Sequence, residues 1–124
     1  MPEWVHQFIV RVRDLFHEGV LRSDWNGHGA RALQIEAVEL AMRVLGALLH
    51  ERPRPFPTWI VPTFRGGLQL EWKVDEIELE IDVDPNGTIE VLFSDRGEQK
   101  EWDGSFSERI DDVHHVLDRI AAAR

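Results

Sequence analysis

Apolar and polar residues alternate along residues 66–93 more strictly than anywhere else in the chain. Strict alternation predicts β-strands that have one buried face and one face open to water. Turn-forming residues divide this stretch, so we predict three antiparallel strands over residues 68–74, 77–83 and 89–93. The apolar residues that would form the buried face are Leu68, Leu70, Trp72, Val74, Ile77, Leu79, Ile81, Val83, Ile89, Val91 and Phe93.

Two turns predict the same register for these strands. A two-residue loop at residues 75–76 places Val74 opposite Ile77. A three-residue loop at residues 85–87, closed by a glycine in the left-handed region, places Val83 opposite Ile89. In this register every buried residue meets another buried residue, as a well-specified sheet requires.

The same register brings like charges together on the outer face. It sets Glu71 opposite Glu80 and Asp82 opposite Glu90. Like charges directly across an antiparallel ladder destabilise the sheet. A basic partner docked on this face would recover that loss of stability.

Helices are predicted before and after the strands, packed on one face of the sheet. Apolar residues at spacings of three and four indicate amphipathic helices over residues 3–20 and 34–50. Three prolines within residues 52–57 exclude helix there and predict an extended connector. Ser105 and Glu108 form a capping-box pattern, with Ser105 as the N-cap of a last helix.

One strand is predicted before the central three. Residues 58–64 form an edge strand in this prediction, because Pro62 cannot donate a hydrogen bond to a neighbour. If residues 65–67 close a hairpin, Ile60 faces Trp72. Trp59 and Val61 then point to the outer face.

A short fifth strand is predicted over residues 98–102, and its register has two alternatives. A two-residue turn at residues 96–97 buries Trp102 beside Val91, whereas a three-residue loop places Trp102 outside. We favour the buried position. The sequence as a whole predicts a single α+β domain spanning residues 1–124: two N-terminal helices, a four- or five-stranded antiparallel β-meander and a C-terminal helix.

Charge is distributed unevenly along the chain. The net charge is −9, and residues 1–65 carry +1 whereas residues 66–124 carry −10. This acidity argues against direct binding to nucleic acid, which needs clustered basic side chains. It is compatible with a protein partner that has a basic surface, or with a homodimer in which arginines of one copy meet the acidic sheet of the other.

Cysteine is absent, so the chain has no disulfides and no thiolate ligands. Residues 1–16 mix charges into their apolar positions, unlike a signal peptide or a membrane span. We expect a cytoplasmic protein that does not associate with membranes. No cofactor-binding motif is present in the sequence, and we predict none.

The glycine-rich stretch Asp24 to Ala30 has two interpretations. His28 could act as a general base oriented by Asp24, which would make the protein a small enzyme. Alternatively, Gly27 and Gly29 take positive φ angles so that Trp25 fills a gap between the helices and the sheet. We favour the structural interpretation.

Metal binding is not predicted. Asp24 and Asn26 begin like a calcium loop, but Ile35 stands where a bidentate glutamate is required. His114 and Asp118 have a spacing that could hold zinc on one helix face, but no third ligand is evident.

Three motifs together resemble a group of small uncharacterised bacterial proteins. These motifs are W-N-G-H-G-A at residues 25–30, V-P-T at residues 61–63 and G-G-L-Q-L-E-W at residues 66–72. In that group the first motif is usually W-D-G-x-G-A, and Asn26 departs from it. The resemblance implies a shared fold and a bacterial origin, and it implies no catalytic residue.

The absence of catalytic motifs and the acidic outer face together predict a non-catalytic protein-binding module, of the antitoxin, immunity or accessory-subunit type. The alternative is a small enzyme with a site at His28. The residues we predict to contact a partner are Glu71, Glu80, Asp82, Glu90, Trp59 and Val61.

Overall fold

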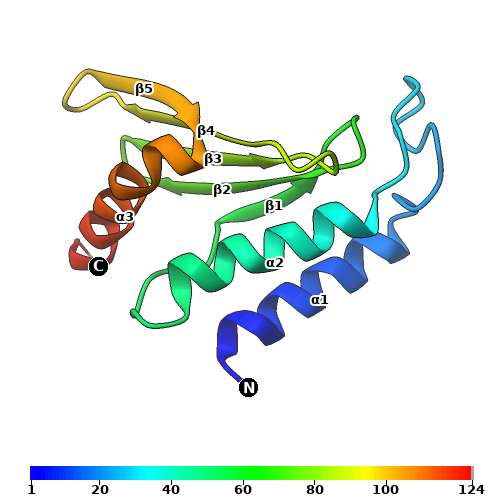
Figure 1. The fold of residues 1–124 in the computed structure, drawn as a ribbon, viewed down its shortest axis with the longest axis horizontal. Helices are drawn as coiled ribbons and strands as arrows, with labels where there is room; N and C mark the ends of the chain where they lie inside the picture. Colours follow the sequence, from blue (N-terminus) through cyan, green and yellow to red (C-terminus); the bar gives the residue numbers. More distant parts are fainter. Residues whose placement is uncertain (124) are drawn as a thin grey trace.

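The computed structural model describes residues 1–123, which form the helices and strands drawn in Figure 1. The helices are α1 (Glu3–His17), α2 (Ile35–Leu49) and α3 (Phe106–Ala122). The strands are β1 (Trp59–Pro62), β2 (Leu68–Val74), β3 (Ile77–Val83), β4 (Ile89–Asp95) and β5 (Lys100–Ser105). The predicted α+β fold is confirmed, with five strands in the sheet.

The strands form one antiparallel sheet in the order β1-β2-β3-β4-β5. The three described helices lie on one face of this sheet (Figure 1), with α2 against β2 and β3 and with α3 against β4 and β5. α1 runs antiparallel to α2 and packs beside it. The molecule therefore has two layers, and no helix of residues 1–123 covers the outer face of the sheet.

The predicted register of the three central strands is confirmed. Val74 pairs with Ile77 across the first turn, where Asp75 has a φ of 55°. Val83 pairs with Ile89 across the second turn, where Gly87 has a φ of 98°. Both turns use a residue in the left-handed region, which matches the right-handed twist of the flanking strands.

The predicted register of β1 is wrong by two positions. Ile60 lies opposite Leu70, where we predicted Trp72. The hairpin closes one residue earlier than expected, because the N–H of Thr63 donates to the carbonyl of Gly67 at 3.0 Å. An even shift keeps each side chain on its face, so Trp59 still points outward.

The predicted partner of Trp102 is also wrong, although its face is correct. β5 pairs Trp102 with Phe93, and their rings stack with centroids 5.0 Å apart. The turn is longer than expected because the Asp95 carboxylate accepts hydrogen bonds from the backbone N–H groups of Gly97 and Glu98. Asp95 is 2% exposed and forms an ion pair with Arg119 of α3.

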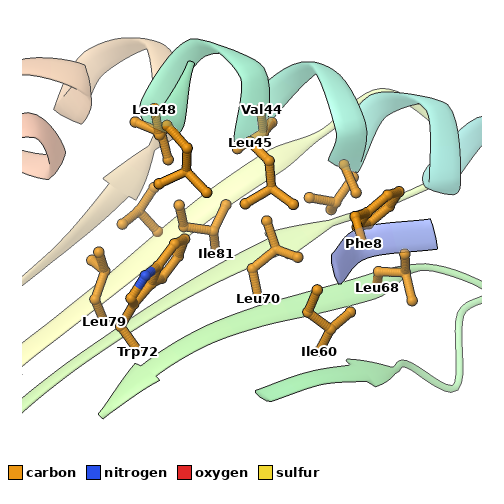
Figure 2. Close-up of a cluster of buried hydrophobic side chains, with 14 of the residues drawn as sticks. Phe8, Val44, Leu45, Leu48, Ile60, Leu68, Leu70, Trp72, Leu79 and Ile81 are labelled. Atoms are coloured by element: carbon orange, nitrogen blue, oxygen red, sulfur yellow. The ribbon is translucent and has the colours of Figure 1, made fainter. Parts of the chain in front are cut away.

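The core lies between the apolar face of the sheet and α2 (Figure 2). Trp72 and Ile81 of the sheet and Leu45 and Leu48 of α2 are each at most 1% exposed. Full burial of such a side chain stabilises a fold by about 1.5–3 kcal/mol. The indole N–H of Trp72 donates to the carbonyl of Pro55 at 2.9 Å, which ties the proline-rich connector to the core.

The helices begin and end close to their predicted limits. α1 stops at His17, three residues earlier than predicted, because Gly19 takes a φ of 87° and ends the helical path. α3 begins directly after Ser105, whose hydroxyl accepts a hydrogen bond from the N–H of Glu108 at 3.2 Å. The predicted N-cap is confirmed.

We expect Gly67→Ala to lower the free energy of unfolding by at least about 2 kcal/mol, because overpacking of this kind strains the backbone. A Cβ at Gly67 would lie 2.2 Å from the carbonyl oxygen of Val83. Gly46→Ala is the matched control, since a Cβ there meets Trp4 at an ordinary 3.6 Å within α2. Urea denaturation should show Gly46→Ala to be neutral or stabilising, and equal losses in both variants would contradict this expectation.

Candidate functional site

The outer face of the sheet is strongly acidic. Alternate residues of each strand point to it, and the strand register shows which of them are neighbours. We call this surface the acidic face; it consists of Trp59, Val61, Gln69, Glu71, Lys73, Glu78, Glu80, Asp82, Glu90, Leu92, Ser94, Glu101, Asp103 and Ser105. Seven of these described side chains are carboxylates, and one, Lys73, is basic.

The six residues predicted to contact a partner fall in two adjacent rows that cross the sheet. One row runs through Trp59, Glu71, Glu80, Leu92 and Asp103. The register therefore brings two predicted glutamates and the predicted tryptophan into line.

The second row lies one pleat further along the strands. It runs through Val61, Gln69, Asp82, Glu90 and Ser105. The predicted site is thus one continuous patch across all five strands.

Like charges face one another in both rows, as the sequence predicted. Glu71 pairs with Glu80, and Asp82 pairs with Glu90. The amide of Gln69 donates to Oε2 of Glu80 at 2.9 Å, which satisfies one carboxylate oxygen but adds no positive charge. Arg65 attracts the charge of Asp82, whereas no cation of the described residues has a comparable effect on Glu80. The repulsion between Glu71 and Glu80 is therefore left largely uncompensated within the described structure.

Burial and repulsion together disfavour the charged forms of two of these groups. The pKa of Glu80 is raised, first because the group is partly buried and then because Glu71 and Glu78 repel its charge. The pKa of Asp82 is raised by burial first and then by the charge of Asp84. A positive charge brought to this patch would favour both carboxylates in their ionised form.

Apolar side chains interrupt the carboxylates. Trp59 of β1 and Leu92 of β4 are each 50% exposed. Val61 is half-buried beside Gln69. Leu92 was not among the predicted site residues, although it stands at a polar position of an alternating strand, and that break in the alternation was a usable signal.

The acidic face is hollowed on the β4 and β5 side. An open hollow there is lined by Glu80, Glu90, Leu92 and Asp103, among other residues. Asp103 was not predicted as a site residue because the predicted fifth strand ended at residue 102, whereas β5 extends to Ser105. Its neighbour Glu101 lay in the predicted strand but was not included in the predicted site. The lining of the hollow combines four carboxylates with two apolar residues, Val91 and Leu92.

The Asp24 to Ala30 loop holds its own polar side chains in backbone hydrogen bonds. Oδ1 of Asp24 accepts from the N–H of Gly29 at 2.5 Å, and Oδ1 of Asn26 accepts from the N–H of His28 at 2.8 Å. The carboxylate of Asp24 is therefore used within the loop and does not orient the exposed imidazole of His28. None of the five principal hollows formed by residues 1–123 includes His28.

The glycines of this loop have the predicted structural role. Gly27 and Gly29 have φ angles of 76° and 82°. They allow the half-buried Trp25 to reach the core and to donate its indole N–H to the carbonyl of Arg31 at 2.8 Å.

Residues 31–34, which follow the loop, dock on the hairpin between β1 and β2. The N–H of Arg31 donates to the carbonyl of Phe64 at 2.8 Å, and the N–H of Gln34 donates to the carbonyl of Gly66 at 2.9 Å. A Cβ at Gly66 would lie 2.7 Å from the carbonyl oxygen of Ala32. The segment that follows the W-N-G-H-G-A motif is thus in direct contact with the start of the G-G-L-Q-L-E-W motif.

His114 and Asp118 bind a buried arginine of the connector. The guanidinium of Arg54, whose side chain is 1% exposed, lies 2.7 Å from Nδ1 of His114 and 2.7 Å from Oδ1 of Asp118. A guanidinium has no acceptor, so Nδ1 of His114 accepts and carries no proton. Burial first, and then the charges of Arg54 and Arg52, lower the pKa of His114.

Within the part of the chain that the structure describes, no three histidine or acidic side chains are placed to hold a metal ion. No helix there is long and apolar enough to cross a membrane. No family model, curated protein or solved structure matches this chain. The site must therefore be interpreted from its own chemistry.

We expect Glu80→Gln to raise the thermal unfolding temperature at pH 7. The raised pKa means that the ionised carboxylate is less stable in the folded than in the unfolded chain, and glutamine removes that penalty. The gain should shrink as the pH falls towards about 4.5, and it should be lost below that pH, where the carboxyl group is protonated in both states. Calorimetry would measure it, with the exposed Glu39→Gln on α2 as control; equal effects of the two variants at pH 7 would refute this expectation.

We expect His114→Asn to weaken the pH dependence of stability. Because the pKa of His114 is lowered by folding, its contribution is fully present above about pH 6.5 and is lost as the pH falls. Asparagine retains an acceptor for Arg54 but does not titrate. Denaturation at pH 7.5 and 5.5 should show a smaller loss in the variant, and the exposed neighbour His115→Asn should behave like the unmodified chain.

Proposed function

We propose that this chain is a non-catalytic protein-binding module, and that its acidic face docks on a basic surface of a protein partner. The observation that carries this proposal is an uncovered sheet face on which carboxylates are set opposite one another. A module of the antitoxin, immunity or accessory-subunit type fits this chemistry, since each acts by occupying a partner's surface.

Electrostatics supports a basic partner. Arginine or lysine side chains placed between Glu71 and Glu80, or between Asp82 and Glu90, would replace repulsion by attraction. The pKa values of Glu80 and Asp82 are both raised, so their charged forms are disfavoured in the isolated chain. A positive charge from the partner would stabilise these charged forms. The same charge repels the phosphates of nucleic acid.

The exposed apolar side chains support a protein partner over a free cation. Trp59 and Leu92 lie in the same row as Glu71 and Glu80, one toward each side of the sheet. Interfaces typically gain most of their affinity from a few aromatic or aliphatic anchors that charged groups surround. The aliphatic stems of arginine and lysine can also pack on Leu92 while their charges reach the carboxylates.

The test is capture of a partner by the tagged protein from its own cells, with charge-reversed variants. We expect Glu80→Lys with Asp82→Lys to abolish capture of a stoichiometric partner and to leave the melting temperature equal or higher. The control is Glu36→Lys with Glu39→Lys on α2, which makes the same change in net charge away from the acidic face.

Capture should also fall steeply as salt rises from about 0.05 to 0.5 M, because screening shortens the range of the attraction. Capture that survives reversal at Glu80 and Asp82 would overturn the proposal. Sedimentation of the purified chain tests whether the partner is a second copy. A homodimer would show twice the monomer mass, and the variant with Glu80→Lys and Asp82→Lys would sediment as a monomer.

A further inference from the structure

The hydrogen-bonding pattern of the ladder shows which backbone groups point away from the sheet. Successive residues of an antiparallel strand direct their N–H and C=O groups alternately toward one neighbour and the other. The N–H of Asp84 donates to the carbonyl of Thr88 at 2.9 Å, so Thr88 and every second residue after it bond toward β3. The intervening β4 residues, including Phe93, bond toward β5.

The outward groups of β5 follow from this assignment. Trp102 pairs with Phe93 and bonds toward β4. Glu101 and Asp103 on either side of it therefore direct their N–H and C=O groups away from the sheet. β5 presents an edge along which a further strand could bond.

The other edge of the sheet is closed. The bond between Thr63 and Gly67 places the N–H and C=O of Ile60 on the outer edge of β1. Nε of Arg11, from α1, donates to the carbonyl of Ile60 at 2.9 Å. Pro62, the next outward position, has no N–H, so this four-residue strand offers little to a partner.

One outward backbone group of the β5 edge, the carbonyl of Asp103, already accepts a hydrogen bond from a side chain. Nε of Arg109, from α3, donates to the carbonyl of Asp103 at 2.9 Å, and its guanidinium lies 5.2 Å from the ring of Trp102. α3 itself packs under the sheet and does not run along the edge (Figure 1). Within residues 1–123 the N–H groups of Glu101 and Asp103 thus remain directed to solvent.

We propose that the basic protein partner adds an extended segment to the edge of β5 and so continues the sheet. This inference rests on the proposed function and specifies how the partner docks. Residues of the added segment beside Glu101 and Asp103 would lie on the acidic face, where lysine or arginine fits. The residue between them would lie beside Trp102, where an apolar side chain fits.

Charge disfavours a second copy of this chain as the occupant in the antiparallel register centred on Trp102. Two β5 strands paired antiparallel about Trp102 would set Glu101 of one copy opposite Asp103 of the other, twice in each dimer. Like charges directly across a ladder are destabilising. A segment that alternates basic and apolar residues meets complementary charge at the same positions.

The test uses a synthetic seven-residue peptide of alternating lysine and valine, and a second peptide N-methylated on the amides of one edge. The methylated peptide keeps all charges and cannot donate to β5. We expect it to bind at least about tenfold more weakly, because at least two backbone hydrogen bonds are lost. Binding of the unmodified peptide should also slow hydrogen exchange at the N–H groups of Glu101 and Asp103 in NMR spectra.

A variant of Arg109 provides an independent test on the protein itself. Arg109→Ala frees the carbonyl of Asp103 for the peptide and should tighten binding by about two- to tenfold, the effect of one hydrogen bond. Lys100→Ala on the same strand is the matched control, because it removes one positive charge without freeing an outward carbonyl. The control should change binding less than Arg109→Ala does.

The outcomes separate this inference from the proposed function. Equal binding of the two peptides, or unchanged exchange at Glu101 and Asp103, overturns strand addition and leaves docking on the acidic face standing. If N-methylation weakens binding but Glu80→Lys with Asp82→Lys does not, strand addition at β5 stands and docking on the acidic face is overturned. Failure of both peptides to bind overturns strand addition by a basic segment.

Discussion

The packing of the three described helices against one face of the sheet is the constraint on which the rest of the structure depends. It requires Leu70, Trp72 and Ile81 to point to α2, and a slip of one residue would turn all of them to water. The register is therefore held firmly by burial. The alternate positions between them point away from the core. Burial therefore does not restrict which residues stand there.

The strength of this constraint explains which parts of the fold the sequence predicts. The register of β2, β3 and β4 depends on alternation and on two short turns, and both are local signals that can be read from residues 66–93. The registers of β1 and β5 depend on turn hydrogen bonds at Thr63 and at Asp95 that alternation does not predict, and contacts distant in sequence support both turns. The Phe64 carbonyl is bound by the backbone of Arg31, and the loop after Asp95 is stabilised by the ion pair with Arg119. The candidate site was predictable to the same extent. Glu71 and Glu80 follow directly from the central register, whereas Asp103 of β5 lay beyond the predicted strand and could not be placed.

Buried and exposed charges are treated differently in this chain. Asp95 is buried and has Arg119 and two backbone N–H groups as partners; Arg54 is buried and has Asp118. These contacts lower the pKa of both carboxyl groups, by hydrogen bonds from Arg119 and Arg54 respectively. The sequence thus supplies counter-charges to these buried groups, whereas Glu71 and Glu80 of the acidic face lie opposite one another with no ion pair to either among residues 1–123.

The most distinctive motif of the sequence serves the fold. The loop around Gly27 and Gly29 positions Trp25, and Gly66 lets the hairpin approach the backbone at Ala32. Each of these glycines is explained by a φ angle or a close contact. Distinctive residues in this chain therefore mark points where backbone geometry is demanding, and the surface that folding leaves unexplained is the acidic face with its edge at β5. That is why function is better sought there than at His28.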